Sequence, residues 1–309
     1  MSLSRLARLG AALTLATSLG AIALTSPSVS AEPAQAATGD STSKADRTST
    51  KAAGAAAKKR KPASLRKNPQ PKGVPGHWRL IWRDEFRGQH LNTGKWRPNW
   101  LAGSDNAVTK PINSAEKAAY DPRQVSVKHG KLRLKAVRRT THANDGRTYQ
   151  YASGIVESAH DFRFTHGYAE ARIYLPPNRD RSLGHLGSCG PNWAAFWING
   201  ETWPDDGEID VMECLSDDDA SWHYHWSGGQ NGGYPNGWQG DMPGSGGWHT
   251  FGVNWTSNAL TFYYDGKRVG RQTEGVTSTP HYLILNLAIS DNEIKVPQTM
   301  KVGYVRVWK

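Results

Sequence analysis

Hydrophobic and polar residues alternate along several short stretches of the chain, which is the period of a half-buried β-strand. The strand-like stretches are 130–136, 168–174, 260–264, 267–269 and 302–308. Residues 282–289 are instead almost continuously apolar, which is typical of a strand covered on both faces. Asp265-Gly266 separates two of these stretches and predicts a two-residue hairpin turn. Amphipathic helical periods are hard to find after residue 75.

This pattern predicts an all-β fold. Many short strands with Gly, Pro and Asn between them are typical of a sandwich of two antiparallel sheets, which we expect to be curved. The polar segments 178–192 and 227–247 are rich in glycine and predict loops that border a cleft.

The first 31 residues predict a secretory signal peptide, and therefore a secreted, extracellular protein. Arg5 and Arg8 form a basic start, an apolar run covers 9–24, and Val29-Ser30-Ala31 offers a cleavage site. The apolar run is too short and too rich in alanine for a membrane span, and we expect none elsewhere.

Residues 32–74 predict a disordered basic linker, because they hold no aromatic residue and are rich in Ala, Thr, Ser, Lys and Pro. The net charge of +11 comes mostly from residues 1–74, which hold 12 basic and 3 acidic residues. Residues 75–309 hold 26 basic and 24 acidic residues, so nucleic-acid binding by this part has little support. A basic tail that attracts anionic wall polymers is a weaker interpretation than a solvated linker.

Residues 75–309 predict one large domain, since all 13 tryptophans lie there. The two cysteines, Cys189 and Cys214, lie in it as well. In a secreted chain they are expected to form a disulfide, which would connect the loop before Trp193 to the strand that follows. Two buried free thiols are the alternative. We expect the protein to be a monomer.

Candidate chemistry is concentrated in residues 207–214, which read GEIDVMEC. Glu208 and Asp210 share a strand face, because side chains alternate with a period of two. Glu213 would point the opposite way, unless one extra residue at Val211–Met212 forms a β-bulge that returns it to the same face. Three acids on one face of a bulged strand indicate glycosidic bond cleavage. The alternative is a solvated edge strand whose acids face water.

The surroundings of this motif resemble glycoside hydrolase family 16, in its bulged, laminarinase-like (endo-β-1,3-glucanase) branch. The matching segments are Trp82–Phe86, Glu116 with Tyr120, Ser153–Ile155, Gly167–Arg172, Ala195–Trp197, Trp248–Phe251 and Tyr264–Lys267. The resemblance implies a concanavalin-like β-jelly-roll with a concave substrate groove and a retaining mechanism. It also implies that Glu208 is the nucleophile and Glu213 the acid/base, roles that the spacing alone leaves open. Asp210 is expected to orient the nucleophile and to help keep one glutamate protonated.

Aromatic and polar residues near the motif are candidates for sugar binding, because the C–H faces of sugars stack on aromatic rings. These candidates are Trp193, Trp197, Trp203, His223, His225, Asn99 and Trp100. A tryptophan in an all-β protein is as often a core residue. Two histidines at i and i+2 are also compatible with a metal or with a hydrogen-bonded core or surface position, but no third ligand stands nearby. We therefore expect no metal at this site.

We expect no required cofactor. Family members often carry an aspartate near the last strand that helps to bind a structural calcium, and Gly303 stands at the corresponding place. A calcium ion would have to rely on backbone oxygens here.

The sequence thus predicts a secreted endo-acting hydrolase whose partner is a polysaccharide, a β-1,3-glucan. Another polysaccharide, such as a mixed-linkage glucan or a galactan, and transfer to a sugar acceptor are alternatives, because the motif does not define the sugar. A non-catalytic, lectin-like module is disfavoured by the presence of all three acids. A structural protein attached to the cell wall through the basic tail is a weaker alternative.

Overall fold

The computed structural model describes residues 68–175, 189, 191–215, 220–233, 247–290 and 294–309. The predicted signal peptide, most of the predicted linker, and much of the two predicted glycine-rich loops lie outside these residues. Within the described residues, no helix is both long and apolar enough to cross a membrane.

The described residues form strands and one short helical turn. The elements are β1 (Leu80–Asp84), β2 (Ala118–Tyr120), η1 (Pro122–Gln124), β3 (Val125–Val127), β4 (Leu132–His142), β5 (Thr148–Ser153), β6 (Ile155–Glu157), β7 (Gly167–Leu175), β8 (Trp193–Asn199), β9 (Glu208–Glu213), β10 (Ser221–Trp226), β11 (Gly229–Gly233), β12 (Gly247–Thr256), β13 (Ala259–Tyr264), β14 (Lys267–Gln272), β15 (Tyr282–Ala288) and β16 (Gln298–Trp308). Every strand-like stretch of the sequence corresponds to one of them. The predicted hairpin turn joins β13 to β14, with positive φ angles of 47° at Asp265 and 78° at Gly266.

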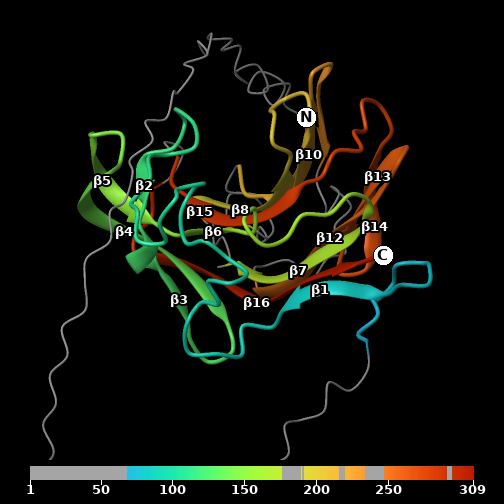
Figure 1. The fold of residues 1–309 in the computed structure, drawn as a ribbon, viewed down its shortest axis with the longest axis horizontal. Helices are drawn as coiled ribbons and strands as arrows, with labels where there is room; N and C mark the ends of the chain where they lie inside the picture. The colour runs from blue at the N-terminus through green and yellow to red at the C-terminus, as the bar shows by residue number, and fades with distance from the viewer. Residues whose placement is uncertain (1–67, 176–188, 190, 216–219, 234–246, 291–293) are drawn as a thin grey trace, which may run out of the picture. The chain divides into compact units, whose positions relative to one another are not determined.

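Two sheets stack face to face, as predicted (Figure 1). One has the order β14-β13-β12-β7-β16-β4-β5-β2, with β1 added to β16 and β3 added to β4. We call it the outer sheet. The other, with the order β11-β10-β9-β8-β15-β6, is the inner sheet. Pairing is antiparallel except between β2 and β5, which run parallel. The fold is therefore the predicted β-sandwich.

The main core lies between the sheets and is filled by alternate residues of each strand. Phe196 and Ile198 of β8 and Met212 of β9 meet Ile173 of β7 and Val253 of β12 there, and all five are fully buried. Phe196 therefore points into the main core, and its neighbour Trp197 lies on the opposite face of the sheet. Strand β15 is buried at every position, as its apolar run predicts.

A second, smaller core covers part of the other face of the inner sheet. Tyr282 and Ile284 of β15 and Trp197 of β8 pack there with Tyr120 of β2, and Trp100 packs against them. The segment that contains Trp100 and β2 therefore lies over the β8–β15 half of this face. Strands β9 and β10 carry no residue of this second core.

The predicted bulge in β9 is confirmed by the strand register. Across β8, Phe196 pairs with Met212 and Trp197 pairs with Asp210, so Val211 has no partner in this ladder. The ladder with β10 shows a shift at the same place. This extra residue returns Glu213 to the face that carries Glu208 and Asp210.

Two segments differ from what the sequence predicts, one in a predicted loop and one at the end of the predicted linker. Residues 229–233 lie in the segment expected to be a loop, but they form β11, because their backbone pairs with β10. Residues 68–74, which composition places in the linker, pack on the outer sheet. Val74 is buried with Tyr168 and Trp308, and the indole of Trp308 donates to the backbone oxygen of Pro69 at 2.6 Å.

Candidate active site

Strand β9 presents its three acids on the face that points away from the main core. It begins after Gly207, whose φ of 87° and close contacts with Tyr224 and Thr277 leave no room for a side chain. Asp210 and Glu213 are buried, whereas Glu208 at the start of the strand is partly exposed. The three carboxyls therefore line a site that is largely screened from water.

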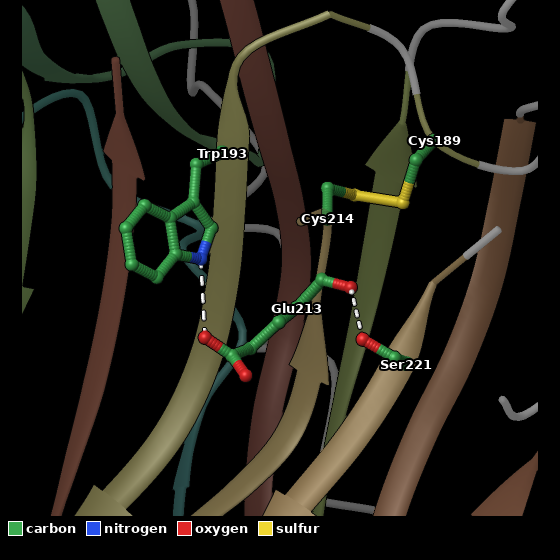
Figure 2. Close-up of a disulfide and its surroundings, with 5 residues drawn as sticks. All are labelled: Cys189, Trp193, Glu213, Cys214 and Ser221. Carbon is green, nitrogen blue, oxygen red and sulfur yellow. Dashed lines mark hydrogen bonds between the residues drawn. A yellow bond between two sulfur atoms is a disulfide. The ribbon is translucent and has the colours of Figure 1, made fainter. Parts of the chain in front are cut away.

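Glu213 is held by two side chains from the neighbouring strands. The indole Nε1 of Trp193 in β8 donates to its Oε1 at 3.1 Å, and Nδ1 of His223 in β10 lies 2.8 Å from its Oε2. Figure 2 shows the indole pointing at this carboxylate. Hydrogen bonds to both oxygens fix the position of the carboxyl group.

The predicted disulfide is present directly beside this glutamate. Cys189 and Cys214 are bonded, with their Cα atoms 5.5 Å apart. Figure 2 shows that the bond joins the end of β9 to the chain that leads into Trp193. Next to it, the hydroxyl of Ser221 donates to the backbone oxygen of Glu213 at 3.3 Å. The bond therefore fixes both the glutamate and its indole donor.

Glu208 is held from the loop that joins β8 to β9. Asp206 shapes this loop, because its Oδ2 accepts from the backbone N–H groups of Glu201 and Thr202 at 3.0 and 2.8 Å. The loop places Trp203 so that its Nε1 donates to Oε2 of Glu208 at 2.7 Å. Trp203 is 59% exposed, so its ring is open to a ligand at the same time.

Asp210 lies between the two glutamates and is expected to be neutral. Burial raises its pKa well above the usual range, and the negative charges of Glu213 and Glu208 raise it further. Its side chain also hydrogen-bonds to Glu208. A protonated Asp210 donates this bond, which favours the ionised form of Glu208. Nε2 of His225 lies 3.2 Å from Oδ2 of Asp210 without the alignment of a hydrogen bond.

The pKa of Glu208 is raised from 4.5 to about 7, first by burial and then by the charge of Glu213. The folded state therefore binds this proton more tightly than the unfolded state, and stability is lost as pH rises from about 4.5 to about 7. We expect Glu208→Gln to raise the melting temperature at pH 8 by a few degrees and to have a smaller effect at pH 5. Thermal unfolding at both pH values checks this. An equal shift at the two pH values would contradict the assigned pKa.

The acids open into a small cavity of about 50 Å³ that is open to solvent and reaches the second core. Its lining residues are Ile112, Asn113, Glu116, Trp193, Ala195, Trp197, Glu208, Asp210, Glu213 and Asn286. Trp197 is only 6% exposed, and its Nε1 donates to Oδ1 of Asn286 at 2.9 Å. It therefore forms part of the cavity wall, and its ring is not an exposed platform.

Of the predicted binding residues, Trp193 and Trp197 line this cavity. Trp203, His223 and His225 contact its carboxyls without lining it. Trp100 stacks on Trp197 with ring centroids 5.4 Å apart, so it supports the wall from behind. Asn99 is fully buried, and it donates to the backbone oxygen of Ser104 at 2.7 Å and accepts from N–H of Ala102 at 3.2 Å. The structure thus assigns Asn99 to its own loop and does not place it in the groove, because both ends of its amide are used there.

His223 and His225 share the face of the acids, as their i, i+2 spacing predicts. They contact Glu213 and Asp210 respectively. Among the described residues no group of three His, Cys, Asp or Glu side chains is arranged to hold a metal ion. The contacts that the structure gives these histidines are with the carboxyls of Glu213 and Asp210.

Sequence reasoning did not assign Glu116, Asn113 or Asn286 to the site. Glu116 contributes to the family resemblance, but its segment has no periodic pattern that would predict its approach to β9. Asn286 is the one polar residue of the otherwise apolar β15. A lone amide inside a fully buried strand must have a hydrogen-bond partner, so the sequence could have indicated a polar neighbour for Asn286.

The surroundings of Gly303 do not fit a calcium ion. A Cβ atom placed there would meet the ring of Trp248 at 3.4 Å, the backbone oxygen of Arg172 at 3.6 Å and a guanidinium nitrogen of Arg172 at 3.7 Å. This guanidinium stacks over the Trp248 ring, 4.6 Å from its centroid. A fixed positive charge repels a divalent cation. In this chain the place of the family's aspartate is bordered by the guanidinium of Arg172 and the ring of Trp248.

A pair of carboxyl groups in one cleft is the arrangement typical of glycoside hydrolases, and here each of the two glutamates accepts a hydrogen bond from an indole. The chain belongs to glycosyl hydrolases family 16, whose sequence profile matches residues 113–292.

Individual relatives agree with this assignment. The glucan endo-1,3-beta-glucosidase A1 of Niallia circulans is 29% identical over 273 residues, which cover 74% of this chain and 38% of that protein. The endo-beta-1,3-glucanase of Pyrococcus furiosus superposes with a TM-score of 0.60 at 26% identity, over 75% of this chain and 94% of that one. SCLam, a non-specific endo-beta-1,3(4)-glucanase, superposes with a TM-score of 0.62 at 26% identity, over 78% of this chain and 94% of that one. The chain spans about two fifths to half the length of the first curated relatives.

Proposed function

We propose that this protein is a secreted, endo-acting, retaining hydrolase of β-1,3-glucan. The observation that carries the proposal is the bulge at Val211, because it turns Glu208 and Glu213 into one cleft. The names of the Niallia circulans and Pyrococcus furiosus relatives support β-1,3-glucan as the substrate class. The predicted signal peptide and the disulfide support export to an oxidising environment.

In this mechanism Glu208 is the nucleophile and Glu213 is first acid and then base. Glu208 attacks the anomeric carbon while Glu213 gives its proton to the leaving oxygen, and a glycosyl–enzyme ester forms. Glu213 then takes a proton from water, which attacks the same carbon and releases Glu208. The bonds from Trp203 and Asp210 stabilise the departing carboxylate. The described residues supply the acid, base and nucleophile, and the steps use water alone as co-reactant.

The pKa of Glu208 determines how the proposed hydrolysis depends on pH. Glu208 must be ionised when it attacks. Because its pKa is about 7, the fraction of molecules with an ionised Glu208 falls as the pH is lowered. The hydrogen bond from Asp210 favours the ionised form and counters the effect of burial. We therefore expect hydrolysis to weaken below about pH 7 as Glu208 takes up its proton.

Product analysis tests the function. The full chain is incubated with laminarin, lichenan, agarose and a galactan, and the products are separated by chromatography, with Glu208→Gln as the control. We expect laminarin to give oligosaccharides of several lengths, with the β-anomer as the first product by NMR. Cleavage of agarose or the galactan alone would show that β-1,3-glucan is not the substrate. Products longer than the starting oligosaccharide would indicate transfer to a sugar acceptor. No release from any of the four would favour a lectin-like module.

A further inference from the structure

The cavity has polar residues on a second element besides the acids of β9. Asn113 and Glu116 reach it from the segment that precedes β2. Glu116 is only 6% exposed, so its carboxyl is a buried group inside a cavity. The mechanism above does not use it.

Three other polar side chains of the cavity wall, those of Trp193, Trp197 and Asn286, have partners within the protein. Trp193 donates its only N–H to Glu213, and Trp197 donates its only N–H to Asn286. Asn286 in turn donates from Nδ2 to the hydroxyl of Tyr120 at 2.9 Å. Tyr120 then hydrogen-bonds to Glu116, which ends the chain of bonds.

Glu116 retains capacity to accept further hydrogen bonds. Besides Tyr120, its Oε2 accepts from N–H of Ile112 at 3.5 Å and its Oε1 from Nδ2 of Asn113 at 3.4 Å, both at the long limit of such bonds. A carboxylate has room for about four donors. Burial raises the pKa of Glu116 to about 7, which shows how poorly its charge is compensated by the protein alone.

Asn113 is exposed, and among the described residues one of its two Nδ2 hydrogens has no protein partner. Its Oδ1 accepts from N–H of Ala115 at 2.9 Å, and only one of its two Nδ2 hydrogens is directed to Glu116. The cavity thus offers an acceptor and a donor side by side. Adjacent hydroxyls of a sugar ring donate and accept at such a spacing.

We propose that Glu116 accepts, and Asn113 donates, hydrogen bonds to hydroxyls of the sugar bound in this cavity, which makes the pair a determinant of substrate recognition. The proposal rests on the function proposed above. A buried group with unmade hydrogen bonds costs free energy in the empty enzyme, and a bound hydroxyl supplies the missing partner. A sugar without that hydroxyl leaves the carboxyl unpaired and is rejected.

A purely structural role for Glu116 predicts a different result. Its bonds to Ile112 and Asn113 hold the segment before β2, so loss of these bonds alone would lower the melting temperature. Such a role leaves the affinity for sugar unchanged in a folded variant. Affinity and stability must therefore be measured on the same protein.

The test uses the inactive Glu208→Gln protein, so that binding is measured without turnover. Laminarihexaose is titrated into this protein, with and without Glu116→Gln, by calorimetry. We expect Glu116→Gln to weaken binding about tenfold or more, since hydrogen bonds to charged groups contribute that much. The matched control is Glu274→Gln, the same change at an exposed carboxyl that does not line the cavity. It is expected to leave the dissociation constant unchanged.

Each outcome decides the proposal. Equal dissociation constants with and without the Glu116→Gln change, in proteins of similar melting temperature, would overturn it and leave the proposed function intact. If Glu116→Gln does not fold, Asn113→Ala decides instead, with a loss of about threefold or more expected and no loss contradicting the proposal. Failure of the Glu208→Gln protein itself to bind laminarihexaose would overturn both this proposal and the proposed function.

Discussion

Glu208→Gln and Glu213→Gln are each expected to abolish the hydrolysis of laminarin while leaving the fold intact. Loss of the nucleophile removes the covalent route, for which we expect a fall in kcat of about 10⁴-fold or more. Loss of the acid/base should cost about 10² to 10⁴-fold. Reducing-sugar release measures both, and circular dichroism confirms folding. Near-normal turnover of either variant would refute the assignment.

Rescue with azide distinguishes the two roles. With an aryl β-laminarioside as substrate, azide attacks Glu208→Ala directly from the face opposite the leaving group and yields the α-glycosyl azide. With Glu213→Ala the covalent intermediate still forms, so azide yields the β-glycosyl azide. NMR of the products reports the configuration. If the two variants gave the opposite products, Glu213 would be the nucleophile.

Replacement of both cysteines by serine should have the second largest effect. The bond closes a loop across 25 positions, and its loss is expected to cost about 3 kcal/mol of unfolding free energy. The melting temperature should fall by about 6–12 °C. Because Cys214 follows Glu213 directly, we also expect kcat to fall.

Thermal unfolding and kcat check this prediction. Wild-type protein treated with dithiothreitol should match the Cys189→Ser/Cys214→Ser variant in both measurements. Ser227→Ala, a change on the exposed turn after β10, is the control and should change neither. A double variant with wild-type melting temperature would show that the bond constrains nothing that folding requires.

The common face of the three β9 acids and the bulge in this strand could be predicted from the local sequence alone. A period of two places Glu208 and Asp210 together, and one additional residue is needed to bring Glu213 to their side. The register confirms this, with Val211 as the additional residue. The same locality made β13, β14 and their turn predictable, because Asp265-Gly266 favours that turn wherever it occurs.

The rest of the cleft depends on contacts between distant segments, which no local pattern reveals. Glu116 meets β9 only because the segment before β2 packs across β8 and β15. Asn99 is adjacent to Trp100 in sequence, yet one supports the cleft wall and the other holds its own loop. Strand β11 was missed because Gly, Gln and Asn disfavour strands, and pairing with β10 overrides that preference.

The position of Cys214 links the maturation of the enzyme to its surroundings. In a reducing cytoplasm the two thiols stay apart, so the end of β9 and the approach to Trp193 lack their covalent clamp. The geometry around Glu213 is then completed only after the disulfide has formed. A chain whose disulfide has not yet formed would thus be least able to perform the proposed reaction.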